Sequence, residues 1–198
     1  MPIDLHDVAA HMRDFGLCLL GRAVADATCS EMMRQYAHAS AVTMAGQAAE
    51  IIIKAKISDT SPLLVFAKLP ASPQTDRELT VEDLFDSGRS HMFDELPNLL
   101  WAVTGIRVPN LAEYRNFGKL RNTIMHFAVP EEELADSTLS FAVNVMEPMV
   151  RTFWQISAIA YAEEYDEVIS EGYLEEQLVR FGLPIDAHLR NVLTPPNI

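Results

Sequence analysis

The chain has 198 residues, of which 49% are hydrophobic and 22% are charged, and its formal net charge at pH 7 is -13. This composition is typical of a folded globular protein and excludes a disordered chain, and the length suits one domain over residues 1–198. The acidic charge opposes non-specific binding to nucleic-acid backbones, which depends on Lys and Arg contacts. It does not exclude a local anion-binding site.

No apolar run approaches the roughly 20 residues that a membrane-spanning helix needs, so we expect no membrane partner. The segment Met1 to Asp4 lacks the basic start and apolar run of a secretory signal. Cys18 and Cys29 match no metal or redox spacing. We therefore expect a cytoplasmic protein with no metal and no other cofactor.

The first half of the chain predicts two helices. Apolar residues recur at helical spacing over residues 4–20, and Gly21 is expected to end this first helix. Thr28 or Ser30 can cap a long second helix that reaches about Ile57. Its many Ala and Met side chains favour close packing against a neighbouring helix.

The middle of the chain predicts a long loop followed by two short helices. Residues 58–80 hold three prolines among Ser and Thr residues, which indicates a loop that covers a site or moves. A capping box at Thr80 to Asp83 begins a short helix, and a further helix is expected over residues 92–103. We expect Trp101 of that helix to lie in the core rather than to stack on a base.

The C-terminal third predicts more helix. Residues 134–165 are expected to form one long helix bent at Pro148, and residues 167–181 a last helix before Gly182 and a polar tail. Strand patterns are nearly absent from the whole sequence. The predicted fold class is therefore all-α, an antiparallel helical bundle.

The most informative helix is expected from about Pro109 to Phe127. Its core-facing stripe lies within an arc of roughly 80° and consists of Glu113, Phe117, Leu120, Ile124 and Phe127. Glu113 is out of place on this apolar stripe. The far side carries Arg115, Gly118, Lys119, Asn122 and His126, with Arg121 on the flank. Because Arg121 and His126 diverge by roughly 140°, their side chains converge only through the long stem of the arginine.

This helix carries a local excess of positive charge in an otherwise acidic chain. Between Arg107 and His126 the sequence has four basic residues against the single acid Glu113. We expect Arg115 and Lys119 to help bind a confined anionic substrate. One upstream carboxylate, Glu50, stands four residues before Lys54 in the order that favours an ion pair. Two interpretations of Glu50 remain open: a surface ion pair, or a carboxylate that reaches the positive helix.

Arg121, Asn122 and His126, together with the Ala-rich, Glu-containing segment 47–55, resemble the HEPN family of small α-helical domains. Many members of that family are metal-independent ribonucleases. The matching regions cover roughly residues 30–130, and the resemblance implies a HEPN-like core at about residues 28–165. Extra helices would then lie at both ends of the chain.

The resemblance implies an endoribonuclease that acts as a homodimer, in the manner of a toxin or defence protein. His126 would act as base or acid on the RNA 2′-hydroxyl and 5′-oxygen, and Arg121 would stabilise the phosphate charge. Asn122 would orient the substrate or the imidazole. One histidine does not supply both proton transfers, whereas two copies across a two-fold axis would. At Gly118 a second helix or an RNA strand could approach closely.

One departure from the family concerns regulation. HEPN toxins that nucleotidyltransferase partners neutralise carry a tyrosine two residues after the histidine, and this chain has Ala128 there. Modification of a tyrosine is therefore not implied. Two alternatives to the ribonuclease remain open: a non-catalytic HEPN module that binds a nucleotide or a partner, and an acidic, antitoxin-like helical interaction protein.

Overall fold

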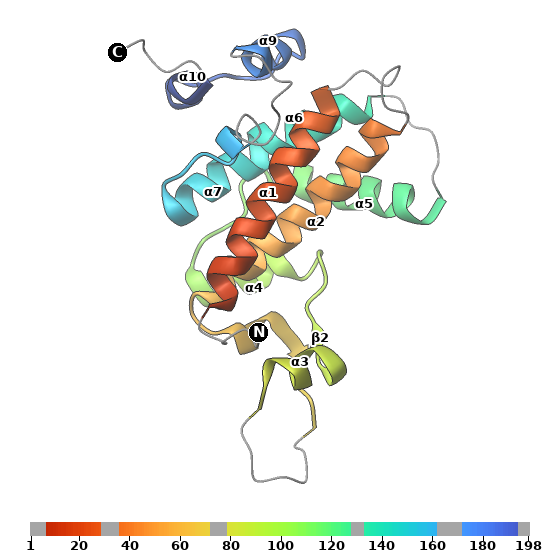
Figure 1. Cartoon of the computed structure of the whole chain (residues 1–198), viewed down its shortest axis with the longest axis vertical. Helices are drawn as coiled ribbons and strands as arrows, with labels where there is room; N and C mark the ends of the chain where they lie inside the picture. The colour runs from red at the N-terminus through yellow and green to blue at the C-terminus, as the bar shows by residue number, and fades with distance from the viewer. Residues whose placement is uncertain (1–6, 29–35, 72–78, 128–132, 162–171, 194–198) are drawn as a thin grey trace.

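Two long antiparallel helices, α1 (Val8–Thr28) and α2 (Ala37–Ser58), lie side by side in the computed structural model (Figure 1). The structure describes residues 7–28, 36–71, 79–127, 133–161 and 172–193. A Cβ added at Gly16 of α1 would stand 2.7 Å from Ile52 Cγ1 of α2, so the two helices approach closely. Small side chains of α2 are fully buried at this contact, as its composition predicts: Ala41, Ala45, Ala48 and Ala49.

Both helices differ from their predicted ends. Helix α1 does not stop at Gly21 but continues through it to Thr28, and Leu20 and Val24 on either side are buried. Burial of these side chains outweighs the cost of about 1 kcal/mol for a glycine inside a helix. Helix α2 begins after Tyr36, which has the left-handed φ of 63°. The predicted cap Ser30 lies outside the described residues.

The segment expected to be a long loop contains secondary structure. A short 3₁₀ helix η1 (Pro62–Val65) leads into strand β1 (Phe66–Lys68), which pairs antiparallel with β2 (Arg89–Ser90). Helix α3 (Val81–Ser87) lies between the strands in sequence, and its capping box at Thr80 and Asp83 is confirmed. Strands this short give almost no periodic signal in a sequence.

Helix α4 (Leu96–Thr104) begins four residues later than predicted, and the prediction that Trp101 lies in the core is wrong. Trp101 is 51% exposed and has the guanidinium of Arg107 above its ring, 5.3 Å from the centroid. Leu96 and Leu100 of α4 are fully buried instead. The aliphatic face of α4 therefore supplies its part of the core.

Helix α5 (Leu111–Phe127) is rotated relative to the predicted stripe. Its buried residues are Tyr114, Phe117, Gly118 and Ile124, whereas Phe127 is 75% exposed. Gly118 is buried because Phe93 fills the space beside it, where an added Cβ would stand 2.6 Å from the ring. The expectation that Gly118 admits a second helix or RNA is therefore wrong. Phe93 also stacks on Tyr114, with ring centroids 4.2 Å apart.

The long C-terminal helix is predicted in part. Helices α6 (Leu134–Phe141) and α7 (Glu147–Trp154) are joined by a π-helical segment, η2 (Ala142–Met146). Pro148 has no N–H to give to the carbonyl of Asn144, and that carbonyl instead accepts a hydrogen bond of 2.7 Å from Asn110 Nδ2. The helix ends at Trp154, where Gln155 caps it with a left-handed φ of 60°, and not at Tyr165 as predicted.

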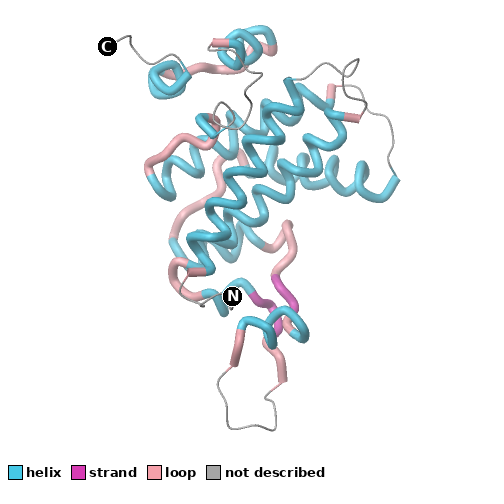
Figure 2. Tube along the Cα trace, viewed as in Figure 1, coloured by secondary structure: helices cyan, strands magenta, loops and turns pink. Residues whose placement is uncertain are grey.

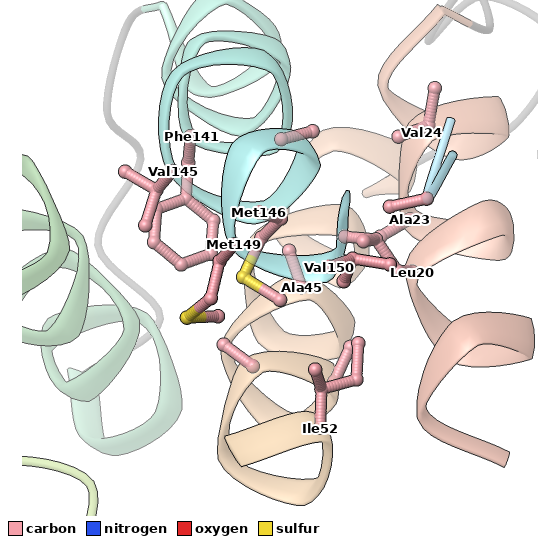
Figure 3. Packing of buried hydrophobic residues seen from close by; sticks show 14 of the residues in the cluster. Leu20, Ala23, Val24, Ala45, Ile52, Phe141, Val145, Met146, Met149 and Val150 are labelled. Atoms are coloured by element: carbon pink, nitrogen blue, oxygen red, sulfur yellow. The ribbon is translucent and has the colours of Figure 1, made fainter. Parts of the chain in front are cut away.

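The main core lies where α6, η2 and α7 cover the α1–α2 pair, and Figure 3 shows its packing. Met146, Met149 and Val150 face Leu20 and Ala23 of α1 and Ala45 and Ile52 of α2. All of these side chains are at most 1% exposed. The apolar side chains that recur at helical spacing from Phe141 to Ala160 in the sequence predict an inner stripe, and this prediction holds in part. Phe141, Val145, Met149 and Phe153 are buried, whereas Ile156 and Ala160 are half-buried.

The last described elements are α9 (Tyr173–Arg180) and α10 (Ala187–Leu193), which lie at the opposite end of the molecule from α3 and β2 (Figure 1). The expected polar tail after Gly182 is wrong, because α10 buries Leu189 and Leu193. Asp186 caps this helix by accepting a hydrogen bond from the backbone N–H of Leu189, at 2.8 Å.

The fold is all-α, as the sequence predicts, and its two short strands are a minor addition (Figure 2). Among the described residues no helix has both the length and the apolar character needed to cross a bilayer. The packing of α5 against α2 on one side and α6 on the other determines where its polar side chains point.

Candidate functional site

Arg121 of α5 points toward α2 rather than to the solvent. Its stem lies against Gly46, where an added Cβ would overlap Arg121 Cδ and stand 3.0 Å from Cγ. The guanidinium sits above the ring of Phe93, 5.1 Å from its centroid. The Arg121 side chain is 17% exposed, so this cation is mostly removed from water.

Glu50 of α2 reaches the arginine. Its Oε2 atom lies 3.4 Å from Arg121 Nη1, and Asn122 Oδ1 accepts from Nε at 3.3 Å and from Nη2 at 3.1 Å. Planar guanidinium groups suit such multiple contacts because their donors have fixed directions. Three of the five N–H donors of Arg121 are used in this way.

Lys54 binds the other oxygen of Glu50. Its Nζ donates to Glu50 Oε1 at 2.6 Å and to Ser90 Oγ of β2 at 3.1 Å. Lys54 is only 6% exposed, so the interpretation of a purely surface ion pair is wrong. Since Glu50 lies between Lys54 and Arg121, the three charges sum to +1, and the cluster remains cationic.

Tyr114 lies beside this cluster. Its hydroxyl donates to the carbonyl of Phe93 at 2.8 Å, and the ring is fully buried. Burial raises the pKa of Tyr114 far above its usual value, and the negative charge of Glu50 raises this pKa further. The phenol is therefore a fixed hydrogen-bond donor that holds Phe93 under the guanidinium.

The outer face of α5 carries the other predicted site residues. Arg115, Lys119, Asn122 and His126 are all exposed. The imidazole of His126 meets the ring of Phe127 edge-on, with centroids 6.5 Å apart, and makes no hydrogen bond or ion pair with a described residue. No hydrogen bond, ion pair or ring contact joins Arg121 to His126 within the described part of the chain. The structure thus brings Glu50, Arg121 and Asn122 together and leaves His126 apart.

Sequence reasoning missed two groups that position Arg121. Gly46 precedes Glu50 by four residues, so both lie on one face of α2, and a lone glycine inside a helical pattern is a signal of close approach. Phe93 offers no such signal, because the sequence places it in the helix expected over residues 92–103, whereas it precedes α4 and contacts α5 only through the tertiary fold.

This site is built from charge and hydrogen bonding. Within the described ranges no group of three or more His, Cys, Asp or Glu side chains is placed to hold a metal ion. The held guanidinium can bind an anion, and the exposed imidazole, which lies apart from it on the same helix, can move a proton. Comparison of the chain with models of protein families, with curated proteins and with solved structures finds no match.

Proposed function

We propose that this protein is a HEPN-type, metal-independent endoribonuclease that acts as a homodimer, with Arg121, Asn122 and His126 as its catalytic residues. The observation that carries the proposal is the way Arg121 is held. Its stem packs on Gly46 and its guanidinium is bound by Glu50 and Asn122. One N–H on each of Nη1 and Nη2 has no partner among the described residues.

A guanidinium held in this way suits the stabilisation of a phosphate. Arginine keeps its charge at all working pH values and presents paired donors to two oxygens. A preorganised cation in a partly dry site stabilises developing charge more than a mobile one in water. Lys54 supports this role because it offsets the charge of Glu50.

His126 would carry the proton transfer. Histidine is the side chain whose ordinary pKa lies near neutral pH, so it can take a proton from the 2′-hydroxyl or give one to the 5′-oxygen. Transfer of the 2′-hydroxyl proton lets that oxygen attack the adjacent phosphorus, and the 5′-oxygen leaves with a proton. The products are a 2′,3′-cyclic phosphate and a 5′-hydroxyl. The two transfers need two histidines, which the homodimer supplies.

The exposed cations would bring the RNA to this face. Arg115 and Lys119 lie on the same side of α5 as His126. In a protein of net charge -13, such a local cationic face admits a short, flexible anionic strand better than a long duplex. The substrate expected is therefore single-stranded RNA.

One observation favours the second candidate, a non-catalytic HEPN module that binds a nucleotide or a partner. The contacts of Arg121 with Glu50 and Phe93 tie α5 to α2 whether or not a reaction occurs. His126 does not join them. In that case the cluster serves the fold and the cationic face serves binding alone.

The deciding experiment incubates the purified protein with mixed RNA in EDTA and identifies the product ends. We expect cleavage to 2′,3′-cyclic phosphates, with a loss of about 100-fold or more in Arg121→Ala and in His126→Ala. His11→Ala, an exposed histidine of α1, is the matched control and should keep full activity. Nucleotide binding without cleavage would support the non-catalytic module. The absence of both cleavage and nucleotide binding would support the interaction protein.

A second variant keeps Arg121 but displaces its guanidinium, and so tests whether the position of that group matters for cleavage. Gly46→Ala places a Cβ against Arg121 Cδ and forces the guanidinium away from Glu50. Alanine is favoured over glycine inside a helix by about 1 kcal/mol, which offsets much of the strain. We expect near-normal stability by urea denaturation but RNA cleavage lowered about tenfold. Unchanged cleavage would mean that the position of the guanidinium does not matter.

A further inference from the structure

A groove of about 370 Å³ lies between α5 and α6, on a different side of α5 from Arg121. Six residues line it: Glu113, Asn116, Phe117, Leu120, Ser137 and Ser140. Volumes of this size lie within the range of roughly 300–1,000 Å³ that is common for small-molecule sites. The groove is therefore large enough for a compact ligand.

Glu113 is the acid that stands out on the apolar stripe of this helix, and the groove accounts for its position. Its Oε1 atom accepts a hydrogen bond of 2.6 Å from Ser140 Oγ. The Ser140 oxygen in turn accepts from Asn144 Nδ2 at 3.1 Å, so the hydroxyl hydrogen is committed to Glu113. The carboxylate is thus held in one orientation by a short chain of hydrogen bonds.

The second oxygen of Glu113 is available to a ligand. Among the described residues no Lys, Arg or His forms an ion pair with Glu113, in contrast to Glu50. A half-buried carboxylate without a counter-charge attracts a cation, since partial removal from water strengthens the interaction between the two charges. The same charge repels phosphates and carboxylates, so an anion is not the expected occupant.

The rest of the groove offers an apolar floor and a polar rim. Phe117 is 3% exposed and stacks on Phe141 with centroids 4.0 Å apart, so the floor is rigid, and Leu120 widens it. Asn116 and Ser137 make no side-chain hydrogen bond with any described residue, which leaves donors and acceptors at the rim. This pattern fits a molecule with a compact apolar body and one charged nitrogen group.

We propose that this groove binds a small organic cation, an ammonium or amidinium group on a compact apolar body, with Glu113 as its counter-charge. The proposal does not depend on RNA cleavage, because the groove faces α6 and the arginine cluster faces α2. Ser140 orients the carboxylate, while Ser137 and Asn116 donate to or accept from the ligand at the rim.

The test is a titration followed by amide chemical shifts, with four probes that share one ring: benzylamine, benzamidine, benzyl alcohol and benzoate. We expect one or both cations to shift the amides of residues 113–120 and 137–140 saturably. Benzyl alcohol and benzoate should bind at least about tenfold more weakly, because they lack the charge-assisted contact. The tighter of the two cations identifies the preferred head group, ammonium or planar amidinium.

Two variants and a control make the result decisive. Glu113→Gln keeps the acceptor for Ser140 but removes the charge, and should weaken binding of the cation at least about tenfold. Ser137→Leu fills the rim without touching the carboxylate and should also abolish saturable shifts. Glu82→Gln, an exposed acid of α3, should change nothing. The proposal is overturned if no cation shifts these amides, if benzyl alcohol binds as tightly, or if Glu113→Gln binds as the native chain does.

Discussion

Two carboxylates are held inside this helical protein in opposite ways. Glu147, at the start of α7, is 2% exposed and is bound mainly by N–H groups of the backbone. Its Oε2 atom accepts from the amides of Ala158 at 2.7 Å and Ile159 at 3.1 Å, and from the hydroxyl of Ser157 at 3.1 Å. Its Oε1 atom lies 3.6 Å from Nε2 of His188, beyond hydrogen-bond distance.

Glu50 is held by cations instead. Its side chain is 26% exposed and contacts Lys54 on one oxygen and Arg121 on the other. Cations on flexible stems can exchange one anionic partner for another, whereas backbone amides in a turn cannot move without refolding that turn. Glu147 therefore stabilises the fold, whereas Glu50 holds the guanidinium of Arg121 in place. Under the proposed function, that guanidinium also contacts the phosphate.

The largest effect that tests this contrast is expected from Glu147→Ala. The change leaves two buried amides and one hydroxyl without an acceptor, and each unsatisfied group costs about 1–3 kcal/mol. We expect a loss of about 3 kcal/mol or more in the free energy of unfolding, measured by urea denaturation. Glu147→Gln keeps one acceptor oxygen and should lose markedly less. Equal stability of Glu147→Ala and the native chain would contradict a structural role.

An intermediate effect is expected from Glu50→Gln. Lys54, which is 6% exposed, loses its counter-charge, and the cost is about 1–2 kcal/mol after allowance for the partial exposure of Glu50. Under the proposed function this variant should also lower RNA cleavage, because Arg121 is no longer held. Glu147→Gln serves as the control, with stability changed and cleavage per folded molecule unchanged.

A double variant sharpens the same point. Adding Lys54→Met to Glu50→Gln removes the unpaired cation, so part of the lost stability should return, while cleavage stays low. If the loss of unfolding free energy in the double variant equals the sum of the losses in the two single variants, the two charges are not coupled. The measurement is again urea denaturation, with the two single variants in parallel.

Local patterns predict the parts of this fold that depend on near neighbours. The capping box at Thr80 and Asp83 and the small residues of α2 are confirmed because their contacts are determined within a turn or on one helix face. The end of α7 at Trp154 is not predicted, because Glu147 binds amides up to 12 residues further along the chain. No short window of sequence holds that information.

The candidate site is likewise predicted by local patterns only in part. The positions of Arg121 and Asn122 on one helix follow from periodicity, but the rotation of α5 does not. It depends on Phe93, which fills the space beside Gly118 and stacks on Tyr114. With that ring in place, the face of α5 toward α2 includes Arg121, so the guanidinium turns inward, away from His126.

The smallest effect is expected at Asp186, which is more exposed than Glu147 or Glu50. Its side chain is 53% exposed, and its pKa is held below the usual value, first by the backbone N–H of Leu189 and then by Arg151. Asp186→Ala removes an N-cap of α10 and should cost about 1 kcal/mol at pH 7, seen as faster amide exchange in residues 187–193.

The pH dependence of this effect follows from the lowered pKa of Asp186 in the folded protein. The native carboxylate stabilises α10 fully above the ordinary Asp pKa and loses this effect as the pH falls through the folded value. The difference between the native chain and Asp186→Ala should therefore shrink below about pH 4. Asp186→Asn, which keeps a cap without a titrating charge, should lose the pH dependence but little of the protection at pH 7. A difference that grows on acidification would show that a charge other than Asp186 holds α10 in place.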